Sequence, residues 1–218
     1  MAEAADLTLD ELRIALGPRI AAAAIFDGWN ETALAEAARE AGVDPAVARL
    51  AFPGGAMDMI AGWVASVDGE MTAAFEPLVL AQMPIRERIR SLVWFRLEAV
   101  AGLEEALRRA LAIQAMPQNL ARSAKLGWAS ADAMWRLAGD TATDYNHYTK
   151  RAILASIYAA TLAVFVSDES AGKADTRAFL DRRIEGVMKF EKAKAQLLQG
   201  REHFDVMRFL GRLRYPAR

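Results

Sequence analysis

Residues 140–151 hold the side chains with the most chemistry in this sequence. Asp, Asn, His, Tyr, Lys and Arg lie together there, directly before a long apolar stretch. Asp144 and His147 are one helical turn apart, a spacing that suits two ligands of one metal ion. Di-iron bundle sites need four carboxylates and two histidines, whereas this segment offers one carboxylate and one imidazole for such a pair. We therefore predict no metal site and no cofactor.

The same segment presents one polar and aromatic face if it is helical. Its residues at i, i+3, i+4 and i+7 share one side of a helix. They are Asp144, His147, Tyr148 and Arg151. Aromatic rings and arginine are enriched at the energetic centres of protein interfaces. We predict that this face docks a protein partner, and the alternative is a helix N-terminus with solvated polar side chains.

The composition fits one globular domain and excludes several function classes. The chain has 218 residues, 54% of them apolar, and a formal net charge of -1. It has no cysteine, which excludes thiol catalysis, thiolate zinc sites and disulfides. Since the pattern offers no set of nucleophile, base and orienting group, we predict that the protein is not an enzyme.

Helical patterns run through nearly the whole chain. Ala, Leu, Glu and Arg dominate, apolar residues recur at helical spacing, and strand patterns are missing. Thr8 and Glu11 form a capping-box pattern for a first helix, and Asp44 with Pro45 opens a later one. Longer helices are expected at about 56–75, 84–101, 103–115, 118–138, 144–167 and 175–198. The sequence therefore predicts an all-α fold.

Residues 31–52 have the spacing of a helix-turn-helix unit that resembles those of TetR repressors. Its second helix, at residues 44–52, begins with an acid, offers Arg49 as its one base and is otherwise mostly apolar. Residues 1–60 carry ten acids against four bases. Because duplex binding draws most of its affinity from neutralised phosphates, we predict a packing role for this unit and no nucleic-acid partner.

Charge reverses at the other end of the chain. Residues 176–218 carry eleven bases against five acids, and the helix at 175–198 has a broad apolar face. Bulky apolar residues beside Lys and Arg favour a membrane surface, and a terminal helix lying on the core is the alternative. A second candidate surface anchor is expected at 202–213. The membrane-binding residues predicted on the first helix are Phe179, Leu180, Ile184, Val187, Met188 and Phe190.

The most specific parts of the sequence are residues 133–135 followed by 138–151, then residues 157–158, and then residues 175–176 with 179–184. Through these parts the chain resembles the Coq-nine family, the lipid-binding accessory proteins of ubiquinone biosynthesis, and the resemblance covers essentially residues 7–198. It implies a TetR-repressor-like bundle of about nine to ten helices that has given up DNA binding, and a homodimer. It also implies a cavity for isoprenoid lipid, a C-terminal amphipathic membrane-binding helix, and presentation of quinone precursors to the demethoxyubiquinone hydroxylase. The implied partner-binding residues are Met134, Asp144, His147, Tyr148 and Arg151.

On this interpretation the long helices enclose the lipid. The residues predicted to line the cavity are large and mostly apolar: Trp63, Val67, Met71, Phe75, Trp94, Phe95, Ile157, Tyr158, Leu162 and Phe165. We expect a helix-turn-helix-like unit at 1–55, a lipid-binding core at 56–172 and a basic C-terminal part at 173–218. The chain start has no signal or transit-peptide pattern, which predicts a bacterial protein in the cytoplasm, peripheral to the inner membrane. The rival function is a TetR-type transcriptional regulator that binds DNA and a hydrophobic effector.

Overall fold

The computed structural model describes residues 7–143 and 145–199, with side chains described as far as Phe190. Within these ranges the chain forms ten α-helices and two short 3-10 helices, and it contains no strand. The prediction of an all-α fold is confirmed. The segment expected at 202–213 and the residue Asp144 lie outside the described residues.

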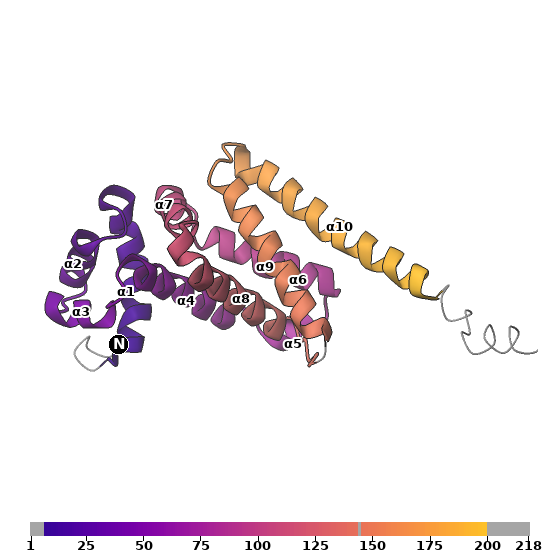
Figure 1. Ribbon diagram of the computed structural model, residues 1–218, viewed down its shortest axis with the longest axis horizontal. Coiled ribbons are helices and arrows are strands. Elements are labelled where there is room, and N and C mark those ends of the chain that lie inside the picture. The colour runs from indigo at the N-terminus through magenta and orange to yellow at the C-terminus, as the bar shows by residue number, and fades with distance from the viewer. Residues whose placement is uncertain (1–6, 144, 200–218) are drawn as a thin grey trace, which may run out of the picture.

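Three helices form one end of the molecule (Figure 1): α1 (Leu9–Asp27), α2 (Glu31–Glu40) and α3 (Pro45–Ala51). Each begins at a side chain that caps it. Thr8 and Glu11 form the predicted capping box, and Asp44 accepts a hydrogen bond from the backbone of Ala46. Because these caps satisfy orphan backbone N–H groups, the sequence alone fixes where the helices start.

Helix α4 (Ala56–Ala74) crosses α1 at close range and links this end to the rest of the molecule. The approach depends on two glycines. A Cβ added to Gly17 would lie 2.7 Å from the backbone carbon of Gly62, and a Cβ on Gly62 would lie 2.7 Å from the carbonyl oxygen of Arg13. Any larger residue at either position would force the two helices apart.

The body consists of α4 together with α5 (Pro77–Ala81), α6 (Ile85–Glu98), α7 (Glu104–Gln114), α8 (Leu120–Leu137) and α9 (Tyr145–Phe165). The 3-10 helix η2 (Pro117–Asn119) precedes α8. Helix α5 was not predicted. It has five residues, and the burial of Leu80 anchors it, which is a tertiary contact that periodicity over so short a stretch cannot reveal.

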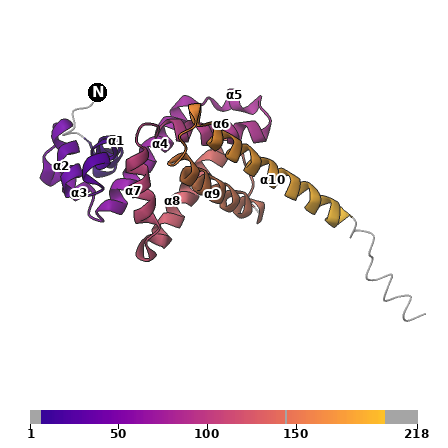
Figure 2. The same ribbon diagram turned by 90° about the horizontal axis from the view of Figure 1, so that it is seen from above.

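Helix α10 (Ala174–Gln199) follows the 3-10 helix η3 (Ala171–Lys173) and packs on α9 and α6. Asp168 fixes its start, since the carboxylate accepts hydrogen bonds from the backbone and hydroxyl of Thr176 at 2.8 and 2.6 Å. The hydrogen bonds from Ser170, and then those from Thr176, hold the pKa of Asp168 well below its usual range. The later part of α10 projects beyond the other helices in both views (Figures 1 and 2).

The first half of α10 is tied to the body by charged side chains. Arg90 donates to the carboxylate of Asp181 at 2.6 Å, and the guanidinium of Arg177 lies 3.6 Å from the centre of the Trp94 ring. Leu180 and Ile184 are buried here. The prediction that these two residues face a membrane is wrong for the docked helix, because they occupy the core face of α10.

The length and hydropathy of the helices indicate whether any of them could cross a bilayer. No single helix among the described residues is both long and apolar enough to cross a bilayer. Helices α3 and α4 taken together are long and apolar enough, and the chain bends by 84° at the break between them.

Candidate functional site

A cavity of about 550 Å³ lies between α4, α7, α8 and α9, and we call it the inner cavity. Its volume falls in the range of small-molecule sites. The wall is predominantly apolar and aromatic. Its larger members are Ile60, Trp63, Val64, Val67, Val100, Leu107, Leu111, Leu120, Leu126, Trp128, Tyr158 and Leu162. Such a wall suits an apolar occupant.

One charged side chain, Arg96 of α6, takes part in this wall. It is 1% exposed, forms an ion pair with Asp68 of α4, and donates to the Ser130 hydroxyl at 3.0 Å. The Tyr158 ring centre lies 4.9 Å from the guanidinium carbon. Burial opposes the charge of Arg96, yet Tyr158 and Asp68 raise its pKa above the usual value. Burial also raises the pKa of Asp68, and Arg96 offsets this in part.

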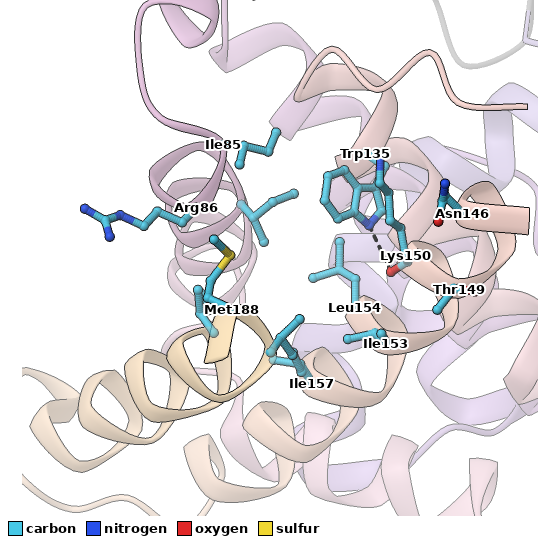
Figure 3. Close-up of a pocket in the computed structure, with 13 residues that line it drawn as sticks. Ile85, Arg86, Trp135, Asn146, Thr149, Lys150, Ile153, Leu154, Ile157 and Met188 are labelled. Atoms are coloured by element: carbon cyan, nitrogen blue, oxygen red, sulfur yellow. Dashed lines mark hydrogen bonds between the residues drawn. The ribbon is translucent and has the colours of Figure 1, made fainter. Parts of the chain in front are cut away.

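A second, smaller cavity of about 230 Å³ lies between α6, α9 and α10, and we call it the α10 groove (Figure 3). Its apolar residues are Ile85, Ile89, Ile153, Leu154, Ile157, Ile184, Val187 and Met188. Trp135 closes one side and donates from its indole Nε1 to the carbonyl oxygen of Lys150 at 3.0 Å. Arg86 extends away from the groove in Figure 3. Helix α10 is thus one wall of this groove.

A second buried arginine, Arg151, lies at the start of α9. It is 2% exposed and donates to Asp132 at 2.5 Å, to Asp140 at 3.0 Å and to the backbone carbonyl of His147 at 3.1 Å. Lys150 adds a contact to Asp140 at 2.7 Å. Burial raises the pKa of Asp140, but the hydrogen bonds from Lys150 and Arg151 outweigh burial and hold it below its usual value. We call these side chains the Arg151 network.

The rings of Trp128, His147 and Tyr148 lie close together next to this network, and we call them the aromatic patch. The Tyr148 ring centre lies 5.1 Å from that of His147 and 6.0 Å from that of Trp128. Tyr148 is 61% exposed, whereas His147 and Trp128 are half-buried. Trp128 also lines the inner cavity. The patch therefore adjoins the cavity wall through one shared side chain.

The partner-binding face in the structure differs from the predicted one in its residues. Met134 and Arg151 are buried, so the prediction that their side chains lie on the surface of the chain is wrong. The reason is that α8 packs against this side of α9 and brings Asp132 to Arg151. His147 and Tyr148 reach the surface as expected, and Trp128 joins them.

The predicted lipid-binding residues separate into three groups. Trp63, Val67, Tyr158 and Leu162 line the inner cavity, and Ile157 lines the α10 groove. The others line neither cavity: Met71, Phe75, Trp94, Phe95 and Phe165. Phe75 and Phe95 pack edge to face at 5.5 Å, and Trp94 lies beneath Arg177. For these five the assignment to cavity wall is not supported, because helical spacing predicts burial without telling which buried side faces a void.

The charged residues at the polar end of the inner cavity were not predicted from the sequence. Arg96 and Asp68 each interrupt an otherwise apolar helix face, in Trp94-Phe95-Arg96-Leu97 and Ser66-Val67-Asp68. A charged residue within an apolar stripe is a signal of a buried pair, since charges enter a core when they are paired. That signal could have identified both residues.

The predicted membrane face of α10 is divided between core and solvent. Leu180 and Ile184 are buried, and Phe179 and Val187 are partly buried. Met188 and Phe190, nearer the projecting part, are 48% and 63% exposed. The exposed apolar residues therefore follow the buried ones along α10, and Met188 also lines the α10 groove.

The described residues contain no group of three or more His, Cys, Asp or Glu side chains that could hold a metal ion. His147 donates to or accepts from its surroundings through Nδ1, which lies 2.9 Å from the carbonyl oxygen of Ala142. Asp144, whose spacing from His147 would suit a metal pair, lies outside the described residues.

The helix-turn-helix-like unit offers little to a DNA duplex. The exposed side chains of α3 include Val47 and Leu50. Its base, Arg49, is already paired with Glu31, at 2.7 Å from Nε to the carboxylate. Base readout and phosphate contacts draw largely on basic side chains, and Arg49 is the one base of this helix.

Comparison with known proteins finds a family model that matches part of these features. The COQ9 family model matches residues 120–191, which comprise α8, α9 and much of α10. The chain carries a COQ9 domain. The resemblance predicted from the sequence is confirmed. The matched residues include the aromatic patch and the Arg151 network, whereas α4 and α6, which bring Asp68 and Arg96, lie outside this range.

Full-length relatives extend the COQ9 similarity. The chain is 35% identical over 168 residues to the mitochondrial ubiquinone biosynthesis protein COQ9 of Rattus norvegicus, covering 74% of this chain and 54% of that protein. With its Homo sapiens counterpart the identity is 34%, covering 74% of this chain and 52% of that protein. The chain thus spans about half the length of these relatives.

A solved structure shares the fold. The TetR transcriptional regulator from Nitrosomonas europaea ATCC 19718 superposes with a TM-score of 0.62 at 21% identity, covering 80% of this chain and 97% of that one. The predicted TetR-like bundle is confirmed. Fold similarity at this identity carries no functional assignment.

Proposed function

We propose that this COQ9-domain protein acts in ubiquinone biosynthesis as a lipid-binding accessory protein and not as an enzyme. It holds an isoprenoid lipid or quinone precursor and presents it, at a membrane surface, to the demethoxyubiquinone hydroxylase. The observation that carries the proposal is the inner cavity, a volume of about 550 Å³ with a predominantly apolar wall, in a homologue of ubiquinone biosynthesis proteins.

The cargo follows from the chemistry of the cavity wall. Each methylene sheltered from water contributes about 0.8 kcal/mol, so an isoprenoid chain gains several times that per unit when it leaves water. The aromatic and aliphatic residues of α4, α7, α8 and α9 offer such shelter. An apolar cavity of this size favours a lipid over a polar metabolite.

Membrane contact is supported by the end of α10. Met188 and Phe190 are exposed where the helix projects beyond the body, and Lys189 lies between them. Exposed apolar side chains beside bases suit an anionic bilayer surface. That this surface is the inner membrane of a bacterium, and that the protein is a homodimer, remain predictions from the sequence.

Hydroxylase docking is supported by the aromatic patch. Tyr148 presents an exposed ring, and Trp128 connects the patch to the wall of the inner cavity. A partner bound there would sit next to the stored lipid. Aromatic side chains are typical energetic centres of protein interfaces.

Lipid carriage is tested by mass spectrometry of lipid extracted from the purified full chain. We expect isoprenoid quinones or their precursors to copurify. Leu111→Trp replaces an aliphatic side chain of the cavity wall with a bulky indole ring, and it should reduce the bound lipid severalfold. Ala112→Trp adds the same ring at the neighbouring exposed position of α7 and should leave the lipid content unchanged. Lipid-free wild-type protein that also fails to bind liposomes would contradict the proposal.

Docking is tested by pull-down of the hydroxylase. The double variant His147→Ala and Tyr148→Ala should weaken capture while its lipid content stays that of the wild type. Tyr145→Ala is the matched control, because it removes an exposed ring from the same helical turn outside the aromatic patch. Equal capture by the double variant would exclude the patch as the docking surface.

A further inference from the structure

We propose that α5 makes a second membrane contact, separate from the end of α10, in which Leu78, Val79 and Ile85 enter the headgroup layer of an anionic bilayer. We call these three side chains the α5 wedge. The inference rests on the proposed membrane contact of α10 and adds a second element of the chain to it. It starts from apolar side chains that the body leaves in solvent.

The α5 wedge is apolar and yet exposed. Leu78 is 81% exposed, Val79 is 50% exposed and Ile85 is 41% exposed. Residues 77–85 include no charged side chain, and most of them are exposed. Single exposed apolar residues are ordinary on protein surfaces, whereas contiguous exposed apolar patches mark interaction sites.

Arg88 of α6 holds this segment in place. Its guanidinium donates to the carbonyl oxygens of Ala81 and Met83, both at 2.8 Å, and to that of Ala138 at 2.7 Å. Leu80 is 1% exposed and anchors α5 in the core. The exposed side chains therefore stand on a fixed base, which lowers the entropic cost of ordering them on binding.

The backbone of the segment suits the edge of a bilayer, where polar groups need partners within the protein. Pro77 and Pro84 carry no N–H group. The carbonyl oxygens of Ala81 and Met83, at the end of α5, already accept from Arg88. These features lower the cost of taking the segment out of water.

The α5 wedge adjoins the exposed part of α10. Ile85 and Met188 both line the α10 groove (Figure 3). Arg86, Met188 and Lys189 also line a neighbouring hollow between α6 and α10. In both views α5 lies at the end of α4 that is away from α1, α2 and α3 (Figures 1 and 2). The wedge therefore belongs to the part of the molecule that the proposed α10 contact brings to a membrane.

Residue type and charge favour a bilayer over a protein as the partner. Leu and Val are under-represented among the energetic centres of protein interfaces. Residues 77–90 carry three bases and one acid, and residues 181–190 carry three bases and two acids. An excess of bases beside exposed apolar side chains is the combination that binds anionic lipid surfaces.

The absence of cysteine from the sequence allows site-specific labelling of the full chain. Leu78→Cys, Met188→Cys and Leu50→Cys, each labelled with the polarity-sensitive dye NBD, would be mixed with vesicles of phosphatidylcholine and phosphatidylglycerol. We expect a blue shift and a severalfold rise in emission at positions 78 and 188. Position 50 is the matched control and should not respond, because Leu50 is a 65% exposed leucine on α3.

A pair of unlabelled variants measures the weight of the contact. Leu78→Ser with Val79→Ser should weaken vesicle binding roughly tenfold, since two apolar side chains no longer leave water. Val47→Ser with Leu50→Ser is the matched control, because it changes an exposed valine and leucine of α3, and it should bind vesicles like the wild type. Unchanged binding by the α5 variant would refute the contact.

The labels separate the remaining outcomes. A response at position 188 without one at position 78 would refute the α5 contact and leave the proposed α10 contact in place. No response at either position would refute both. A response at position 50 equal to that at position 78 would show adsorption without a defined face. A shift at position 78 that needs no vesicles and grows with protein concentration would assign the wedge to a second copy of the chain instead.

Discussion

Two arginines are buried among the residues whose side chains the structure describes, and their surroundings differ. Arg151 donates to two carboxylates and one backbone carbonyl, and it lines neither cavity. Arg96 has one carboxylate, one hydroxyl and an unpartnered Nε, and it lines the inner cavity. The first arrangement leaves no buried donor unpaired among the described residues, whereas the second leaves Nε of Arg96 unpaired.

The difference separates a fully paired buried arginine from one that keeps an unpaired donor. A buried ion pair contributes little over an apolar replacement, but breaking one strongly destabilises a fold. The Arg151 network therefore holds α8 and α9 together beneath the aromatic patch. The Arg96 site has fewer partners, and it keeps hydrogen-bonding capacity next to an apolar void.

The largest effect is expected from Arg151→Met. The change removes the buried cation that Asp132 and Asp140 share, while Arg136 and Lys150 still pair with them, so the free energy of unfolding should fall by about 3 kcal/mol, the lower end for breaking a buried pair. Urea denaturation measures it. Arg136→Met is the control, since Arg136 is 73% exposed and pairs with the same Asp132. It should cost less than about 1 kcal/mol. Equal losses would show that the network does not stabilise the fold.

Arg96→Met should cost less, about 1–3 kcal/mol. It leaves one carboxylate, that of Asp68, which is 22% exposed and whose pKa burial already raises. That carboxyl can take up a proton once its partner is removed. The same urea experiment measures the loss. A loss as large as that of Arg151→Met would remove the distinction between the two sites.

The two carboxylates should respond to pH in opposite directions. The folded pKa of Asp140 lies below the ordinary value of about 3.9, so its contribution to stability is present above that pH and is lost as pH falls through the folded pKa. The folded pKa of Asp68 lies above it, so its contribution is complete below about pH 3.9 and is lost as pH rises through the folded pKa.

Asparagine variants isolate these two contributions. The stability difference between wild type and Asp140→Asn should shrink as pH falls below about 4, and that between wild type and Asp68→Asn should shrink as pH rises above it. Neither slope can exceed about 1.4 kcal/mol per pH unit for one proton. Urea denaturation at a series of pH values measures both. Slopes of the same sign would contradict the comparison.

The smallest effect on stability is expected at the surface above the Arg151 network. Tyr148→Ala removes a ring that is 61% exposed, so the free energy of unfolding should change by less than about 0.5 kcal/mol. Hydroxylase capture should nevertheless fall. A large loss of stability would mean that Tyr148 belongs to the network beneath it, and the patch would then be structural.

Much of the fold was predictable from local signals. Thr8, Asp44 and Pro45 mark helix starts because capping is a contact between near neighbours. The division of the core was not predictable. Val67 and Met71 lie one helical turn apart and are both buried, yet Val67 lines the inner cavity and Met71 does not. Periodicity records which face of a helix is apolar, and it contains nothing about the distance to the next helix.

Local signals in the sequence were enough to predict an all-helical chain and the resemblance to COQ9 proteins. Which polar residues meet depends on the tertiary structure. Arg96 pairs with Asp68, which lies 28 residues away along the chain, and Arg151 pairs with Asp132, which lies 19 residues away. Such pairs depend on how helices cross, and the crossing follows from side-chain packing over the whole body. The positions of a buried charge and of a void are therefore properties of the assembled bundle.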